Sequence, residues 1–322
     1  MLPDPDSRRE TLTEILTGLQ ATPKTLPSYL QYSEEGSQLF DRVNLLPDFY
    51  PRDAELEIMD RSIGDIAGII GENAYIAEYG SGSSLKTQHL LKHLKTPIAY
   101  VPIDISRIHM LEASKKIQRA FPGLEVIPLC KNFHRSLELP RSSSTPKRKM
   151  GYFPGTSSGN LTPSSLQDLM QRILTQVGPD GALLIGIDLH KDAQIINRAY
   201  NDIGGVSARF NLNALEVIRQ SYDTNLEPKM FYRSAEYNSD LKRMEMKLVS
   251  RTHHSIRIVD QIVDFAESEP ILLDFSYKYT FTGFERLARQ AGWNTLRRWT
   301  DSNGYYSLNL CLSRESLGSP NG

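Results

Sequence analysis

The segment Ala74–Thr87 constrains the fold of this chain more than any other stretch. It is a short apolar run that ends near an acid, Glu78, followed by a turn of small residues and the start of a helix near Lys86. The glycines Gly80 and Gly82 allow the backbone to bend sharply and to approach a ligand closely. In an open α/β sheet, such a turn after the first strand lies at the crevice where cofactors bind. The segment therefore predicts a nucleoside-type cofactor site.

The residues of this turn favour one cofactor over another. The dinucleotide fingerprint G-x-G-x-x-G needs a third glycine where this chain has Leu85, and the Walker pattern G-x-x-x-x-G-K-[ST] is not satisfied. An acid directly before the glycines, as Glu78 is, suits S-adenosylmethionine, whose amino acid portion carries a positive charge. Asp104 ends the next expected strand and could bind ribose hydroxyls, a feature that NAD proteins share. The pattern favours S-adenosylmethionine, with NAD and a turn without a ligand as the alternatives.

Strand-turn-helix units repeat after this turn, and the pattern changes beyond about Lys191. The alternation predicts a mostly parallel, doubly wound sheet. The later runs Arg243–Val249 and Ser255–Val259 alternate in polarity, as antiparallel strands with one polar face do, and indicate a second α+β domain. The expected strands of the main sheet are 75–78, 99–104, 124–130, 150–154, 181–188 and 306–312, and the expected helices are 11–19, 53–70, 86–94, 108–120, 164–174 and 283–291.

Composition excludes several classes of function. The 322 residues carry a net charge of -1, so no overall electrostatic attraction to nucleic acid or to an anionic membrane is expected. Cys130 and Cys311 lie far apart and match no metal or disulfide spacing, and the N-terminus is unlike a signal peptide. His89 and His93 have helical spacing but lack the glutamate of an H-E-x-x-H zinc site. We therefore expect a cytoplasmic monomer without a metal site, without a membrane segment and without a nucleic-acid partner.

A set of short motifs resembles one family, the histidine-specific Nα-methyltransferases of ergothioneine biosynthesis. The motifs occur in order from about residue 24 to 312, and as a set they are specific to the family, whereas the glycine turn alone is not. The matching stretches are Tyr32–Phe40, Leu46–Pro51, Gly80–Thr87, Gly159–Pro163, Asp188–Asp192, Ala199–Asp202, Phe210–Asn213, Val263–Phe265, Ser276–Tyr279 and Trp299–Asp301.

The resemblance implies an S-adenosylmethionine-dependent enzyme that methylates the α-amine of a free amino acid, L-histidine in the family, up to the trimethylated betaine (hercynine). It also implies the fold: an α/β protein with a Rossmann-type, doubly wound methyltransferase sheet and a smaller α+β substrate domain. We expect the S-adenosylmethionine domain at 55–192 and 280–315, the substrate domain at 11–54 and 193–279, and flexible tails at 1–10 and 316–322.

The resemblance also assigns site residues by motif position. Glu78 and Gly82 join the cofactor site from the turn itself. The positions that match the family's cofactor contacts are Gly80, Lys86, Asp104, Asn132, Phe133, Gly155 and Thr156. Asn160 and Tyr200 match the residues that hold the amine and carboxylate end of the substrate, where they would orient the amine for methyl transfer. The positions around the side-chain pocket are Tyr32, Phe49, Met246, Asp274 and Ser276.

Three positions depart from the family pattern. Asn132 replaces an aspartate and can still accept a hydrogen bond from the adenine amino group. Phe49 replaces a tyrosine and removes a hydroxyl near the substrate ring. Asp274 replaces a glutamate, which withdraws the carboxylate by one methylene, roughly 1.5 Å. An imidazole N–H or an indole N–H could meet Asp274, so the alternatives are methylation of tryptophan, tyrosine or another amine, and a non-catalytic binding module.

Overall fold

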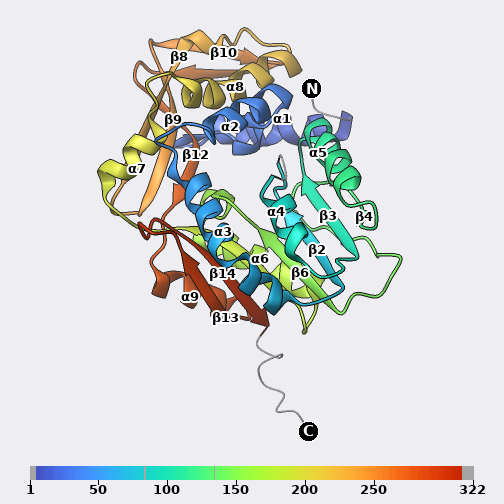
Figure 1. Cartoon of the computed structure of the whole chain (residues 1–322). Helices are drawn as coiled ribbons and strands as arrows, with labels where there is room; N and C mark the ends of the chain where they lie inside the picture. The colour runs from blue at the N-terminus through green and yellow to red at the C-terminus, as the bar shows by residue number, and fades with distance from the viewer. Residues whose placement is uncertain (1–4, 83–84, 134, 314–322) are drawn as a thin grey trace. The chain divides into compact units, whose positions relative to one another are not determined.

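The computed structural model describes residues 5–82, 85–133 and 135–313 and divides the chain into two compact units (Figure 1). Unit 1 consists of Met1–Phe49 and Asp192–Ser276, and unit 2 consists of Tyr50–Lys191 and Tyr277–Gly322. The chain therefore passes between the units at three points, after Phe49, after Lys191 and after Ser276.

Unit 2 is built on a central sheet in the order β13-β14-β7-β6-β2-β3-β4, with β5 also paired to β3. Neighbouring strands from β7 to β4 are parallel, whereas β14 runs antiparallel to β7 and to β13. The strands are β2 (Ala74–Tyr79), β3 (Ala99–Asp104), β4 (Glu125–Val126), β5 (Leu129–Cys130), β6 (Arg148–Phe153), β7 (Ala182–Asp188), β13 (Trp293–Thr300) and β14 (Tyr306–Ser313).

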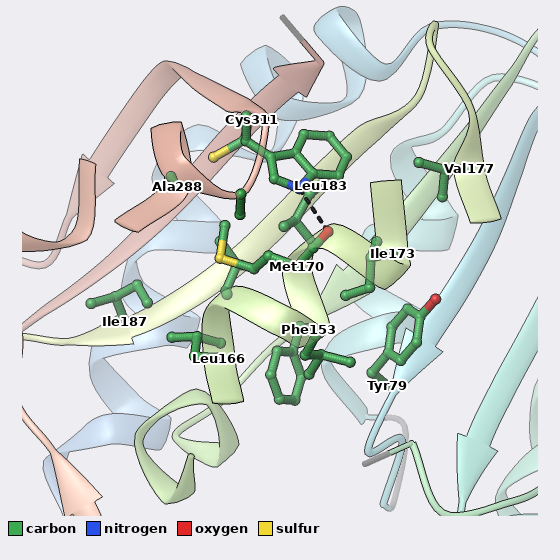
Figure 2. Close-up of a cluster of buried hydrophobic side chains, with 14 of the residues drawn as sticks. Tyr79, Phe153, Leu166, Met170, Ile173, Val177, Leu183, Ile187, Ala288 and Cys311 are labelled. Atoms are coloured by element: carbon green, nitrogen blue, oxygen red, sulfur yellow. Dashed lines mark hydrogen bonds between the residues drawn. The ribbon is translucent and has the colours of Figure 1, made fainter. Parts of the chain in front are cut away.

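Helices cover both faces of this sheet, because successive side chains of a strand point to opposite faces. Tyr75, Ala77 and Tyr79 of β2 lie in the core cluster beneath α6 and α9, a part of which Figure 2 shows. Ala74 and Ile76 lie in the opposite cluster, beneath α3, α4 and α5. The predicted doubly wound α/β fold is thus confirmed. The helices are α3 (Tyr50–Ile70), α4 (Leu85–His93), α5 (Arg107–Ala120), α6 (Pro163–Val177) and α9 (Phe281–Gln290).

Two boundaries of unit 2 differ from the sequence prediction. The expected strand at 124–130 is two short strands, β4 and β5, that keep the same register on β3. Pro128 separates them, because proline has no N–H to donate to the ladder. The strand expected at 150–154 begins two residues earlier, as β6, at Arg148, which pairs with Ala74.

Unit 1 contains a sheet in the order β1-β12-β9-β8 and a separate hairpin of β10 and β11. β1 is parallel to β12, and β8 is antiparallel to β9. The expected antiparallel runs at 243–249 and 255–259 correspond to β9 and β10. The strands are β1 (Lys24–Thr25), β8 (Phe231–Asn238), β9 (Arg243–Ser250), β10 (His254–Ile258), β11 (Gln261–Phe265) and β12 (Pro270–Tyr277, whose last residue falls in unit 2).

The helices of unit 1 pack on this sheet and on the hairpin. Ile15 and Leu19 of α1 and Leu215 of α8 share one core cluster with Phe231, Leu248 and Phe265. A 3₁₀ helix, Ser28–Gln31, precedes α2. The α-helices are α1 (Pro5–Gln20), α2 (Glu34–Val43), α7 (Ala193–Tyr200) and α8 (Val206–Ser221).

The N-terminal prediction was wrong in part. Residues 5–10, expected to belong to a flexible tail, form the first turns of α1. Proline at the first helical position is compatible with a helix start, since its missing N–H has no partner in the helix there. The segment is also held to α8: the Arg8 guanidinium donates to the Ser221 carbonyl, and the Tyr222 hydroxyl donates to the Arg8 carbonyl at 2.8 Å. The expected tails at 1–4 and 316–322 lie outside the described residues.

Candidate active site

The carboxyl end of β2 lies at the point where the strand order of unit 2 reverses. The chain continues from β2 to β3 on one side of the sheet and later adds β6 on the other side. Ligands of open α/β sheets bind outside the strand ends at such a switch point. Gly80 and Gly82 follow β2 with φ of 72° and 48°, a backbone conformation that glycine adopts without strain.

Glu78 is buried beneath this turn. Its carboxylate accepts a hydrogen bond from the Thr87 hydroxyl at 2.6 Å and another from the Tyr100 hydroxyl. Burial raises the pKa of Glu78 to about 7, against the opposing effects of these two hydrogen bonds and of Lys86. Glu78 therefore connects β2, β3 and α4 under the turn.

Asp104 at the end of β3 fixes the backbone of the same turn. Its carboxylate accepts the N–H of Gly82 at 3.1 Å and the N–H of Ser106 at 2.9 Å. The Gly80 N–H donates to the Ile103 carbonyl at 2.9 Å. Burial raises the pKa of Asp104, although the two backbone N–H groups act in the opposite direction. The residue expected to bind ribose thus also holds the glycine turn in place.

Lys86 belongs to a second group, which fixes the turn after β6. Its ammonium forms an ion pair with the fully buried carboxylate of Glu55 on α3, and both Glu55 oxygens accept the N–H of Gly155 at 3.1 Å. The Gly155 carbonyl accepts from the Tyr306 hydroxyl at 2.7 Å. Gly155 has a φ of 73°, and a Cβ there would lie 3.1 Å from the Lys86 ammonium nitrogen. A glycine is therefore needed at this position beside Lys86.

The remaining cofactor-side residues flank these two turns. The Phe133 ring packs edge-on against Phe153, with centroids 5.5 Å apart, and a Cβ at Gly80 would lie 3.5 Å from it. The Asn132 carbonyl accepts from the Arg135 N–H at 3.0 Å. Thr156 precedes the 3₁₀ helix Ser157–Asn160, of which Asn160 is the last residue. Unit 2 thus holds Asn160 and all nine residues expected on the cofactor side.

The other expected substrate residues lie in unit 1, where aromatic side chains bring several of them together. The rings of Phe49 and Tyr200 meet edge-on with centroids 5.8 Å apart. Tyr32 packs in the same cluster, against Phe40 and Phe210. Tyr200 also packs on the neighbouring cluster that contains the buried Met246.

Asp274 and Ser276 lie two residues apart on β12 and therefore share one face of the strand. β12 is the neighbour of β9, which carries Met246. The Asp274 side chain is buried, in a residue only 4% exposed, and accepts from the Gln31 amide at 3.1 Å and from the Phe275 N–H at 2.8 Å. Unit 1 thus contains a buried acid on a strand next to the one that bears Met246.

Sequence reasoning missed two buried polar residues that the structure connects to the expected sites, Glu55 and Gln31. Both are 0% exposed. Glu55 lies on the apolar face of α3, three and four residues before Ile58 and Met59. An acid at such a position is a sequence signal for a buried charge. Gln31 follows Tyr29-Leu30 in a 3₁₀ helix and gives no comparable signal.

Two other structural findings concern metals and membranes. Within the described ranges, no three or more histidine, cysteine, aspartate or glutamate side chains gather as metal ligands would. Among the helices of the described chain, none combines the length and the apolar character that crossing a bilayer requires.

The fold and the two glycine turns define a protein of the nucleoside-cofactor class with a Rossmann-type sheet, and comparison with known proteins identifies the family. A family model described as histidine-specific methyltransferase, SAM-dependent, matches residues 11–313. The chain belongs to this family of S-adenosylmethionine (SAM)-dependent methyltransferases, as the motifs predicted. Its cofactor is accordingly S-adenosylmethionine, and NAD is not supported.

Individual relatives agree with this assignment. Histidine N-alpha-methyltransferase from Mycobacterium tuberculosis is 34% identical over 303 residues, which cover 92% of this chain and 93% of that protein. Its namesake from Mycolicibacterium smegmatis is 32% identical and covers 95% of this chain and 96% of that protein. A 4-dimethylallyltryptophan N-methyltransferase from Arthroderma benhamiae is 28% identical, with coverage of 92% and 93%.

Proposed function

We propose that this enzyme transfers methyl groups from S-adenosylmethionine to the α-amine of free L-histidine, up to the trimethylated betaine. The proposal is supported by the family membership and by the two histidine N-alpha-methyltransferases that match nearly the whole chain. The family match carries the histidine assignment, and Asp274, a buried acceptor on β12 next to the strand that bears Met246, supports a substrate ring with an N–H. Each oxygen of a carboxylate can accept more than one hydrogen bond, so Asp274 would favour a ring that carries an N–H.

The residues of unit 2 fit the cofactor by their chemistry. Lys86 offers a cation for the carboxylate of the amino acid portion, and Glu78 lies under the adjoining turn with a carboxylate that titrates near neutral pH. Asp104 would receive the ribose hydroxyls, with Asn132 and Phe133 at the adenine. Gly155 and Thr156 would line the second turn. When bound, the cofactor supplies a methyl group that is already activated on a sulfonium.

The substrate amine must present its lone pair, because only the neutral amine is a nucleophile. We assign the orientation of that amine to Asn160 and Tyr200. Correct placement of the reacting groups can supply much of the rate enhancement in such a transfer, and no strong general base is required. Tyr32, Phe49, Met246, Asp274 and Ser276 would surround the side chain of the substrate. In this proposal residues 55–192 and 280–315 bind the cofactor, and residues 11–54 and 193–279 bind the amino acid.

A product analysis tests the proposal directly. The protein is incubated with S-adenosylmethionine and a mixture of the twenty free amino acids, and the products are identified by mass spectrometry. We expect mono-, di- and trimethylated histidine to appear in sequence. If a folded protein that binds the cofactor methylates none of the amino acids, the proposal is wrong.

A second candidate substrate is tryptophan or a derivative of it. The shorter acid Asp274 and the absent hydroxyl at Phe49 leave more room for an indole, and one relative is named for methylation of 4-dimethylallyltryptophan. Rates with histidine and tryptophan, measured for the wild type and for Asp274→Glu, separate the two. We expect Asp274→Glu to shift the ratio of kcat/KM toward histidine. An unchanged ratio would show that Asp274 does not contact the ring.

A further inference from the structure

Asp274 is one end of a buried chain of hydrogen bonds inside unit 1. The Gln31 amide nitrogen donates to Asp274 Oδ2 at 3.1 Å and to the Ser28 carbonyl at 3.0 Å. The Gln31 amide oxygen accepts from the Asn211 amide nitrogen. Asn211 Oδ1 in turn accepts from Arg233 Nε at 2.5 Å, and Arg233 also donates to Asn201 Oδ1 at 3.1 Å.

The two ends of this chain fix its direction. Arginine can only donate hydrogen bonds, so the Asn211 oxygen must face Arg233 and its nitrogen must face Gln31. A carbonyl and a carboxylate can only accept, so the Gln31 nitrogen must face Ser28 and Asp274. Burial lowers the pKa of Arg233 to about 10, which leaves it a cation at neutral pH. The orientation of the Gln31 amide is therefore determined from both sides.

The backbone of Gln31 is fixed as firmly as its side chain. The Asn213 amide donates to the Gln31 carbonyl at 2.8 Å and to the Ser33 hydroxyl at 2.8 Å. Gly36 of α2 lies so close that a Cβ there would be 1.7 Å from the Gln31 carbonyl oxygen. Gln31 therefore has little freedom to reorient when a ligand enters.

From these contacts we infer that Gln31 is a specificity-determining positioning residue: it holds Asp274 in place as an acceptor for a substrate ring N–H. This inference rests on the proposed function and adds a residue to it. By donating to Oδ2, the amide fixes the rotation of the carboxylate, and with it the direction in which its oxygens can accept from a ring N–H. The same amide occupies space beside an acid that is one methylene shorter than the family's glutamate. Gln31 and Asp274 would thus act together in ring recognition.

The test compares substrates that differ in the ring N–H. Thiazol-4-ylalanine resembles histidine in its five-membered ring but has no N–H. Steady-state kinetics with both amino acids are measured for the wild type, Gln31→Met and Gln31→Glu. Gln31→Met removes the donor, and Gln31→Glu keeps the shape while replacing the donor with an acceptor. Gln176→Met is the matched control, because Gln176 also links two groups by its amide, Tyr79 and the Leu137 carbonyl.

We expect both Gln31 variants to reduce the preference for histidine over thiazol-4-ylalanine by about tenfold or more, mainly through a higher KM for histidine. Affinity for the cofactor, measured by calorimetry, should stay within about twofold, and Gln176→Met should keep the wild-type preference. If Gln31→Met does not fold, Gln31→Glu carries the test. A folded Gln31 variant with the wild-type preference would overturn this inference alone. A wild-type protein that methylates no histidine would overturn the proposed function, and the role of Gln31 with it.

Discussion

At the scale of single residues, the cofactor side of this enzyme depends on carboxylates that are buried rather than exposed. Glu78 accepts hydrogen bonds from the hydroxyls of Thr87 and Tyr100, whereas Glu55 forms an ion pair with the Lys86 ammonium. Burial disfavours the ionised form of Glu78 more than these hydrogen bonds and the charge of Lys86 favour it, which is why its pKa rises to about 7. A residue of this kind makes the stability of the protein depend on pH.

We predict that Glu78→Gln removes a pH dependence of stability between pH 4.5 and 7. In that range the folded protein keeps a proton on Glu78 that the unfolded chain releases, so the free energy of unfolding of the wild type falls as the pH rises. A pKa raised from 4.5 to about 7 corresponds to about 3 kcal/mol. Urea unfolding of both proteins without cofactor, at several pH values, measures the difference. If the free energy of unfolding changes with pH in the same way for the wild type and Glu78→Gln, the prediction is wrong.

At the scale of elements, close contacts between segments that are adjacent in sequence fix the position of Gln31. α2 begins at Glu34 and packs directly on the preceding 3₁₀ helix, where Gly36 approaches the Gln31 carbonyl. The Ser33 hydroxyl caps α2 by accepting the Gly36 N–H at 3.2 Å, so the glycine is also part of the helix start. Any side chain at Gly36 would push the two elements apart.

We predict that Gly36→Ala destabilises the protein by about 1–3 kcal/mol, the usual cost of overpacking. Gly64→Ala on α3 is the matched control, because nothing lies within 4 Å of a Cβ built there. In that helix the change should be neutral or stabilising by up to about 1 kcal/mol, since alanine favours the helix more than glycine does. Denaturant unfolding measures both. If both substitutions change the free energy of unfolding equally, the backbone near Gln31 moves enough to accommodate the new methyl group at low cost.

Most elements were predictable from the sequence, because their apolar residues recur with the period of a strand or a helix. The predictions failed where local signals were weak or opposed. Pro128 divided a strand that its apolar residues had indicated, and the polar start of α1 gave no helical pattern although contacts from Arg8 hold it to α8. The glycine turn after β2 could be recognised in the sequence because Glu78, Gly80 and Gly82 lie within five consecutive residues. The role of Glu55 could not be recognised in the same way, because its partners Lys86 and Gly155 are 31 and 100 residues away.

At the scale of the whole molecule, one buried carboxylate anchors the chain in unit 2 near all three points where it passes between the units. Asp188 accepts from Tyr50 at 2.8 Å, from Lys191 at 2.5 Å and from Lys278 at 2.7 Å. Tyr50, Lys191 and Lys278 each lie within two residues of one of these points. Burial alone would raise the pKa of Asp188, but the two lysines outweigh it and hold the pKa below its ordinary value. Burial lowers the pKa of Lys191 to about 8 in spite of Asp188.

We predict that Asp188→Asn destabilises the protein by about 3–5 kcal/mol, because it leaves two buried lysines without their counter-charge. Asp223→Asn is the control: Asp223 pairs with Arg257 on the surface, and the loss of such an exposed pair should change stability much less. Thermal and urea unfolding measure both variants. If Asp188→Asn is as stable as Asp223→Asn, the attraction within the buried ion pairs only offsets the free-energy cost of removing their charges from water.

The sequence by itself determined the α/β class, the glycine turn after β2 and the family, because these follow from local periodicity and from motifs of neighbouring residues. Only the tertiary structure decided which charged and polar groups meet. Gln31 meets Asp274 across 243 residues, and Tyr50 meets Asp188 across 138. Such pairs form because polar groups that folding buries need hydrogen-bond partners, and a local sequence pattern does not indicate which distant residue the partner is.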